Sequence, residues 1–295
     1  MKKLLLTFML TAMCGLVPCV SFAIAAGDTY MLREEKYVPL FASNGVSFRY
    51  KIGFRGMNCP ALNTVLPPGS FVKVIDVCCD NTVHVSCKVS EAYSPEGFVH
   101  EKFFRHSMEP LDGALFEKTS PVRKILSVEK ICEMLDSFRG EEIPYAWGCN
   151  NLQELDLGDL YTFVCDDEGG TSYKCVGLDC SGLLHMVSSW LLPHSTVQLD
   201  NFSEGRCLCE LDANSSKAEL KNALDSMLDT DFVVLRYPST FEGHLIIFLH
   251  GGFIEAKGCN FGIVYTDKRD ALGRLEELAK DGKVRVVRWH PELLN

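Results

Sequence analysis

The chain of 295 residues is long enough for one large or two ordinary domains. Its content of 47% hydrophobic and 23% charged residues is typical of a globular protein that folds in water. The formal net charge of −10 at pH 7 excludes nucleic acid and anionic membranes as natural partners, although it permits a neutral or mixed-charge polymer.

Residues 1–26 have the pattern of a secretory signal peptide. Two lysines precede an apolar run at 4–17, and an Ala-x-Ala ending follows at Ala23–Ala25. A retained membrane anchor is the alternative, because nearly the whole stretch is apolar. Lipidation at Cys19 is disfavoured by the proline before it. We therefore expect a periplasmic, secreted or cell-envelope protein without a stable membrane span after cleavage.

Residues 28–115 are predicted to form a small β-barrel. Valine and phenylalanine are frequent there, and glycine and proline punctuate the sequence. Alternating or β-branched stretches predict strands at 71–77, 82–89 and 96–100.

The remaining chain is predicted to be a linker, 116–127, followed by a second domain, 128–295, that mixes helices and strands. Residues 199–216 are polar and are predicted to form a surface excursion. Helical periodicity and strand alternation predict helices at 127–138, 218–228 and 269–280 and a closing strand at 284–289.

The stretch between Trp147 and Cys180 is long and rich in aspartate and glutamate. We interpret it as an acidic surface loop near a cleft. A metal-binding loop is the alternative, but the sequence lacks the Asp-x-Asp-x-Asp-Gly spacing of a calcium loop. No metal or other cofactor is therefore expected.

Residues 177–182 read Gly-Leu-Asp-Cys-Ser-Gly and run into an apolar helical pattern. A cysteine at the start of a helix lies beside backbone N–H groups without partners, which favour the thiolate. Ser181 and Gly182 leave the sulfur of Cys180 uncrowded. One buried helix face is predicted from the apolar residues Leu183, Leu184, Val187, Trp190 and Leu191.

A buried strand at 242–250 carries His244 directly after a glycine. A histidine paired with a cysteine lowers the pKa of the thiol and supplies a proton to the leaving amine. After a Gly-Gly turn, a tight hairpin would place Glu255 opposite Phe248, on the same face as His244. To reach His244 itself, Glu255 would need a bulge or a strong twist.

The second half of the chain resembles the NlpC/p-sixty cell-wall peptidases, a papain-like group of cysteine hydrolases. Four blocks match the family's motifs in order, over roughly residues 120–290. They are Ile143–Gly148 (Pro-Tyr-x-Trp-Gly), Leu178–Gly182 (the nucleophile), Leu192–Gln198 (Pro-Arg-x-Ser-x-x-Gln), and Asp231–Leu235 with Gly243–His244 (the strand and base histidine). The family's second glycine after the tryptophan is Cys149 here.

The resemblance implies that Cys180 is the nucleophile and His244 the general base and acid. The family's third residue, often histidine, aligns with Glu255. A carboxylate can also orient an imidazole and stabilise its charged form. His290 is a weaker candidate for this third group.

The resemblance also implies residues on the substrate side of the site. Tyr145 aligns with a tyrosine near the oxyanion hole, where its hydroxyl and the backbone N–H of Cys180 would hold the tetrahedral oxyanion. Asp179 aligns with a position that faces the free amino end of short peptides, and Ser181 is counted with these residues.

Residues 28–115 are similar to the bacterial SH3-like domains that accompany NlpC-type enzymes. The ending Gly97-Phe98-Val99 resembles their Gly-Trp-Val. In relatives this module restricts which peptides enter the cleft, and Tyr50 and Tyr93 are candidates for contact, although ordinary barrel packing explains each of them better.

The expected fold is therefore α+β, with a papain-like NlpC-type domain after a small SH3-like barrel. The resemblance implies a cysteine peptidase that cuts peptidoglycan stem peptides at the bond between D-glutamate and a diamino acid. A related Cys-His amidase or acyltransferase, and an inactive envelope-binding protein, are the alternatives.

The chain has 14 cysteines, two of them in the signal region. With a secretory signal, disulfides are the natural interpretation. Pairing of Cys165 with Cys175, and of Cys149 with Cys207 or Cys209, is a guess from loop positions. A zinc site is disfavoured because no Cys-x-x-Cys pair occurs.

Overall fold

The computed structural model describes residues 24–33, 37–42, 47–50, 52–53, 56–57, 62–78, 82–90, 93–104, 110, 125–143, 145, 147–156, 162–165, 174–238, 243–258 and 262–294. Most of the expected signal peptide and most of the expected linker lie outside these ranges. Within them, no helix is both long and apolar enough to cross a membrane.

The first part of the chain forms a six-stranded antiparallel sheet in the order β1-β7-β8-β9-β2-β6. Alternate valines of its central strands are buried and form one core. The predicted strands at 71–77 and 96–100 are confirmed, and the one at 82–89 ends at Cys87. The strands are β1 (Thr29–Met31), β2 (Val38–Phe41), β6 (Leu62–Leu66), β7 (Phe71–Val77), β8 (Thr82–Cys87) and β9 (Glu96–His100), followed by the short helix η1 (Glu101–Phe103).

The acidic stretch before Cys180 is not simply a loop. It contains β10 (Asn150–Asp156) paired antiparallel with β12 (Lys174–Leu178), and β11 (Thr162–Cys165) paired in parallel with β3 (Ser47–Tyr50). The acidic residues around these strands suggested a loop, and the partner of β11 comes from more than a hundred residues earlier. Near β3 the chain also forms the small hairpin of β4 (Ile52–Gly53) and β5 (Gly56–Met57).

The second sheet also has six antiparallel strands, in the order β13-β18-β14-β15-β16-β17. The expected surface excursion at 199–216 is corrected, because part of it is the edge strand β13. The expected closing strand at 284–289 corresponds to β18, which lies inside the sheet between β13 and β14. The strands are β13 (Arg206–Leu211), β14 (Phe232–Arg236), β15 (Gly243–Leu249), β16 (Gly252–Lys257), β17 (Gly262–Thr266) and β18 (Lys283–Arg288).

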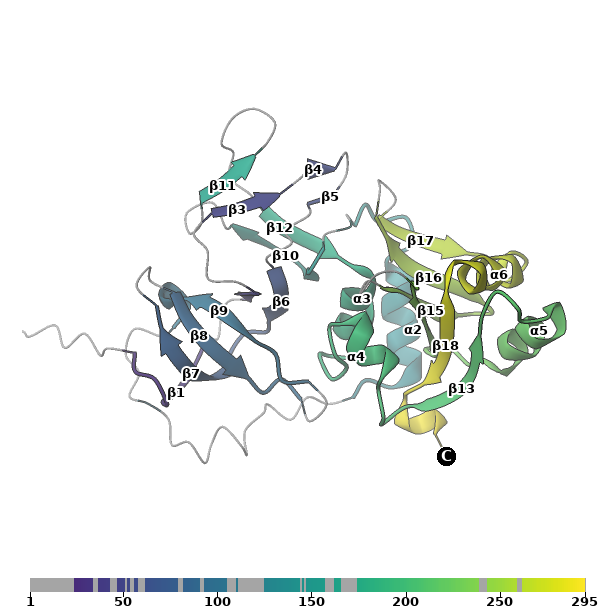
Figure 1. The fold of residues 1–295 in the computed structure, drawn as a ribbon, viewed down its shortest axis with the longest axis horizontal. Helices are drawn as coiled ribbons and strands as arrows, with labels where there is room; N and C mark the ends of the chain where they lie inside the picture. Colours follow the sequence, from purple (N-terminus) through teal and green to yellow (C-terminus); the bar gives the residue numbers. More distant parts are fainter. Residues whose placement is uncertain are drawn as a thin grey trace, which may run out of the picture.

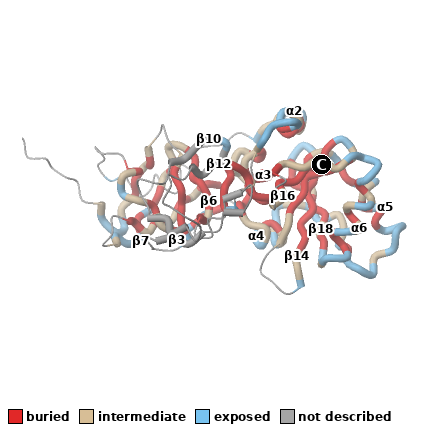
Figure 2. The backbone as a smooth tube through the Cα atoms, turned by 90° about the horizontal axis from the view of Figure 1, so that it is seen from above, coloured by how far each residue is buried: buried red, intermediate tan, exposed pale blue. Residues whose placement is uncertain are grey.

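Helices cover both faces of the second sheet (Figure 1). On one face lie α2 (Val128–Ser137), α3 (Cys180–Val187) and α4 (Thr196–Asp200), whose apolar side chains share a core with β14, β15 and β16. On the other face lie α5 (Lys217–Ser226) and α6 (Ala271–Asp281), with a separate core. The chain ends after the short helix η2 (Pro291–Leu293). Figure 2 shows the buried backbone concentrated in the sheets and in α3.

The helix that begins at Cys180 is shorter than predicted. It ends at Val187, because Ser189 and Trp190 have positive φ angles of 57° and 63°. Trp190 therefore leaves the helix face that the sequence predicted for it and packs against the core of the first sheet. Tertiary packing outweighs the local apolar periodicity at this point.

The described cysteines are thiols: Cys78, Cys87, Cys132, Cys149, Cys180, Cys207 and Cys209. The guessed pairing of Cys149 with Cys207 or Cys209 is therefore not formed. Cys149 is fully buried beside α3, whereas Cys207 is exposed on β13. The side chains of Cys165 and Cys175 lie outside the described set.

Candidate functional site

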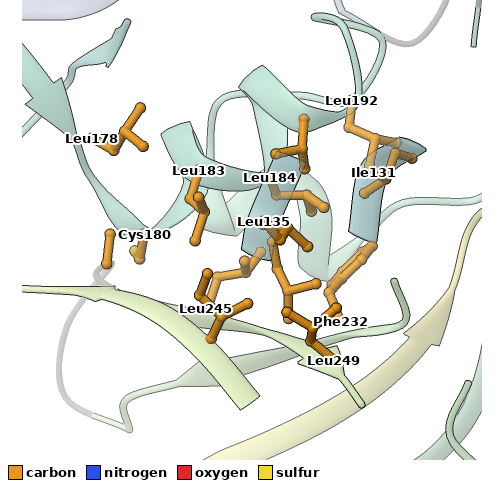
Figure 3. Close-up of a cluster of buried hydrophobic side chains, with 14 of the residues drawn as sticks. Ile131, Leu135, Leu178, Cys180, Leu183, Leu184, Leu192, Phe232, Leu245 and Leu249 are labelled. Atoms are coloured by element: carbon orange, nitrogen blue, oxygen red, sulfur yellow. The ribbon is translucent and has the colours of Figure 1, made fainter. Parts of the chain in front are cut away.

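Cys180 is the first residue of α3 and is only 6% exposed. Figure 3 shows it at the edge of the apolar cluster that also holds Leu183 and Leu245. Burial and then the negative charge of Asp179 raise the pKa of the Cys180 thiol to about 12. The backbone N–H groups of Leu245, Ser181 and Cys180 itself act in the opposite direction. In this state the thiol is protonated at neutral pH, and the expected preference for thiolate is overcome by desolvation.

Asp179 is the N-cap of α3. Its Oδ1 accepts hydrogen bonds from the backbone N–H of Gly182 at 2.6 Å and the hydroxyl of Ser181 at 3.0 Å. Its Oδ2 accepts from the backbone N–H of Gly148 at 2.8 Å. These partners tie the start of α3 to the segment before β10. The structure gives Asp179 and Ser181 partners within the protein, and both also line the cavity beside Cys180, so their implied contact with substrate stays a prediction.

A cavity of about 380 Å³ opens beside Cys180, between the two sheets. Gly148 allows a close approach here, since its φ is +74° and an added Cβ would lie 2.3 Å from the carbonyl oxygen of Leu62. Trp147 and Val197 are each 39% exposed at this cavity. Other residues that line it are Ala42, Leu62, Asn63, Tyr145, Asp179, Ser181, His194, Ser195, Thr196 and Gly243.

His244 and Glu255 form a direct pair. The Nε2–H of His244 donates to Oε2 of Glu255 at 2.5 Å, and the guanidinium of Arg274 donates to both carboxylate oxygens at 2.9 and 2.7 Å. Glu255 is 1% exposed, so burial acts to raise its pKa. His244 and Arg274 outweigh burial and hold the pKa of Glu255 below its ordinary value.

The hairpin register differs from the expected one. Phe248 lies opposite Phe253, and Ile247 opposite Ile254. Glu255 is therefore two positions nearer to His244 than predicted, on the same face as expected, and no bulge is needed for the contact. The expected register was wrong, and with the actual register Glu255 reaches His244, the partner that the family alignment implied, without a bulge.

The Cys180 thiol and the His244 imidazole lie on different faces of β15. Leu245 packs with Cys180, whereas Ile246 packs with α6. By strand alternation His244 shares the face of Ile246, consistent with its bond to Glu255 and the reach of Arg274 from α6. Within the described residues no hydrogen bond joins Cys180 Sγ to the ring of His244. Cys180 lies against Leu245, the residue that follows His244 in β15.

His194 lines the cavity, although the sequence singled it out only as part of the block Leu192–Gln198. Its Nε2–H donates to Asp179 Oδ1 at 3.0 Å, and its Nδ1 lies 2.9 Å from Oγ1 of Thr64 in β6. Arg274 was also missed, because a basic residue in an amphipathic helix gives no signal of its role. Only the three-dimensional contact identifies either one.

The other candidate histidines have structural partners. His185 is buried and its Nδ1–H donates to the carbonyl of Leu192. His290 bonds to the carbonyl of Leu126 and to the backbone N–H of Glu292. It therefore does not lie with His244. Among the described residues, no cluster of three or more histidine, cysteine or acidic side chains is arranged to hold a metal ion.

No protein-family model matches the chain, and no curated protein matches it. Among solved structures, the chain is similar to NlpC1 from Trichomonas vaginalis, with 14% sequence identity and a TM-score of 0.27. The alignment covers 82% of this chain and 65% of that one, so this chain spans slightly less than two thirds of its length.

Proposed function

We propose that the chain is a cysteine hydrolase that cuts an amide bond, with Cys180 as nucleophile and His244 as general base and acid. The observation that carries the proposal is the placement of Cys180. Its thiol lies at the start of a buried helix and beside a cavity, and it packs against Leu245 of β15, the residue that follows His244. Glu255 bonds to His244 and is itself held by Arg274, so it can fix the orientation of the imidazole ring.

In the proposed cycle, His244 accepts the proton of the Cys180 thiol and the thiolate attacks the amide carbonyl. The C–N bond then breaks, and His244 returns the proton to the leaving amine. Water, deprotonated by His244, hydrolyses the thioester, which releases the carboxylic acid and restores the thiol. The backbone N–H of Cys180 and the hydroxyl of Tyr145 would stabilise the oxyanion, since both residues line the cavity.

The first proton transfer requires a movement from the present arrangement. His244 uses Nε2 for Glu255, so Nδ1 is the atom available to accept a proton. Because the ring and the thiol lie on different faces of β15, the start of this strand would have to move to bring Nδ1 to the sulfur. Catalytic hydrogen bonds are often long in unliganded enzymes and tighten only with substrate. Substrate that fills the cavity would have to drive this change.

The proposed substrate is a peptidoglycan stem peptide, cut between D-glutamate and a diamino acid in the cell envelope. This part rests on the motif resemblance. The cavity supports it in size, and its lining offers both apolar side chains (Trp147, Val197) and polar ones (Asn63, Ser195) for a short peptide. The contribution of Leu62 and Asn63 from β6 fits the expected role of the first sheet in limiting entry.

The test is mass spectrometry of defined muropeptides after incubation with three proteins under mild reduction. The proteins are the wild type, Cys180→Ala, and Cys132→Ala as a matched control for loss of a buried thiol in α2. We expect cleavage after D-glutamate by the wild type and Cys132→Ala, and none by Cys180→Ala. Cleavage at another amide that still needs Cys180 would keep the mechanism and replace the substrate. Intact peptides with all three folded proteins would contradict the proposal.

A second candidate function is binding of envelope peptides without turnover. The observation in its favour is the geometry of the site, in which no hydrogen bond among the described residues joins the Cys180 thiol to His244 and the ring bonds to Glu255 instead. Under this alternative Cys180→Ala binds muropeptides as tightly as the wild type, and neither protein cuts them. An amidase or acyltransferase would instead show Cys180-dependent products with a different bond cut or a new amide formed.

A further inference from the structure

A chain of buried polar side chains crosses from the first sheet to the nucleophile helix. Asn150 Nδ2 donates to Thr64 Oγ1 at 3.2 Å, Thr64 Oγ1 lies 2.9 Å from His194 Nδ1, and His194 Nε2 lies 3.0 Å from Asp179 Oδ1. Thr64 and Asn150 are fully buried, and the His194 side chain is 1% exposed. Buried polar groups are costly unless paired, so each link depends on the next.

One arrangement of protons satisfies the whole chain. Asp179 is an acceptor only, so His194 donates to it from Nε2 and its neutral ring accepts at Nδ1. The Thr64 hydroxyl then donates to His194 Nδ1. Its oxygen accepts from the amide of Asn150. In this assignment the Thr64 hydroxyl both donates and accepts, so Thr64 is the centre of the network.

The far end of the network is the cap of the nucleophile helix. Asp179 holds the first turn of α3 through Gly182 and the cavity wall through Gly148. The packing there is tight, since a Cβ on Gly182 would lie 2.2 Å from the carbonyl oxygen of Cys149 and 3.1 Å from His194 Nε2. A shift of His194 is therefore transmitted to the turn that carries Cys180.

The other end of the α3 region is also held by the first sheet. Trp190 packs against its core, and the Ser90 hydroxyl donates to the carbonyl of Leu191 at 2.8 Å. These contacts join the two parts of the molecule independently of Thr64, as does the pairing of β11 with β3. The Thr64 network is therefore not the sole link between them, which makes a more specific role testable.

We propose that Thr64, in the first sheet, is a positioning residue for Cys180 that acts through His194 and Asp179. The first sheet would then set the geometry of the nucleophile, in addition to lining the cavity. This inference rests on the proposed function only in naming Cys180 as the nucleophile, because accessibility of its thiol can be measured without any substrate.

The experiment compares Thr64→Val, which keeps the side-chain shape and removes the hydroxyl, with Thr64→Ser, which restores the hydroxyl. His194→Leu cuts the same network from the other side. Ser70→Ala is the matched control, because the buried Ser70 hydroxyl bonds to the carbonyl of Pro67 within the first sheet's own turn. The readouts are alkylation rates of individual cysteines by iodoacetamide, from peptide mass spectrometry, and kcat and KM for a muropeptide if the wild type cuts one.

Loss of the network weakens the cap of α3, so its first turn opens more often and exposes the thiol. We expect Thr64→Val and His194→Leu to raise the alkylation rate of Cys180 about fivefold, the size of a lost helix cap. Thr64→Ser and Ser70→Ala should leave the rate at the wild-type value. The buried Cys87 and Cys132 report on unfolding of the first sheet and of α2 and should stay protected. For turnover, kcat should fall while KM changes little.

Two results would overturn the inference. One is an unchanged alkylation rate of Cys180 in both Thr64→Val and His194→Leu. The other is equal exposure of Cys180 and Cys87, which would make Thr64 a general stabiliser of the first sheet. If the wild type cuts no peptide, the alkylation rates still decide the role of Thr64. Failure of the Thr64 inference and failure of the proposed function are therefore distinguishable.

Discussion

The molecule holds two buried histidine–carboxylate pairs near Cys180, and they differ in the use of the second ring nitrogen. His194 bonds to Asp179 with one nitrogen and to Thr64 with the other, and its side chain is 1% exposed. His244 bonds to Glu255 with Nε2, its Nδ1 makes no hydrogen bond to any described residue, and its side chain is 15% exposed.

The difference separates a structural histidine from one suited to proton transfer. A ring with both nitrogens occupied by protein groups cannot take a proton from a substrate or a thiol without losing a buried partner. A ring held at one nitrogen and accessible at the other is oriented and still able to react. The sequence does not reveal which histidine keeps an accessible ring nitrogen, since both histidines fall inside motif-like blocks.

The strongest test of the comparison is His244→Ala. Loss of the general base should lower kcat/KM for muropeptide cleavage by about 10³-fold. The loss of stability should stay below about 2 kcal/mol, because Arg274 still pairs with the buried Glu255. Steady-state kinetics and urea unfolding measure the two effects. A variant that keeps more than a tenth of wild-type activity would remove His244 from the proposed mechanism.

His194→Leu should show the opposite balance, with a loss of about 1.5–3 kcal/mol in unfolding free energy, because Asp179 stays buried without one of the hydrogen bonds to its charged form. Burial acts to raise the pKa of Asp179, but His194 and the two backbone N–H groups hold it below its ordinary value. Such a carboxylate stabilises the fold above its unfolded pKa of about 3.9, and this stability is lost as pH falls through the lower folded pKa.

The variant should therefore unfold in acid at a higher pH than the wild type. Urea unfolding from pH 3 to 7 tests this, and His194→Gln is the control because its amide retains a donor and an acceptor. Equal acid stability of His194→Leu and the wild type would show that His194 does not support the charge of Asp179.

Arg274→Met should change the pH profile of activity more than its maximum. Without the guanidinium, burial dominates at Glu255 and its pKa rises. Since the charged form orients His244, the acid limb of the kcat/KM profile should move up by about one pH unit or more. Lys280→Met is the matched control on the same helix, because Lys280 pairs only with Glu276 among described residues. A pH profile identical to that of the control would show that the charge of Glu255 does not support activity through His244.

The local sequence pattern predicted the two elements that hold Cys180 and His244. It did not predict the contacts between elements. The cap and start of α3 and the strand of His244 are short-range features, visible in the order of Asp179, Cys180 and Gly182 and in the apolar run after His244. The end of α3 was misjudged because the partner of Trp190 is the first sheet.

The missed site residues have the same explanation. Thr64 lies 130 positions from His194 in the sequence, and Arg274 lies 19 from Glu255. Neither contact leaves a periodic pattern. The side of β15 on which His244 lies follows from packing of Ile246 against α6, which the alternation of an all-apolar strand could not assign to either face.

His250→Asn should have the smallest effect and completes the comparison with an exposed pair. His250 bonds to Asp136 at 2.8 Å, which raises the pKa of His250, and its side chain is half exposed. A raised histidine pKa stabilises the fold below the unfolded value of about 6.5, and this stability is lost as pH rises through the folded pKa. Asparagine suits the φ of 53° at this position, so the change adds little backbone strain. We expect a loss under about 1 kcal/mol at pH 5.5, less at pH 9, and unchanged turnover. A larger loss, or one that grows with pH, would mean that exposure does not distinguish this pair from those at His194 and His244.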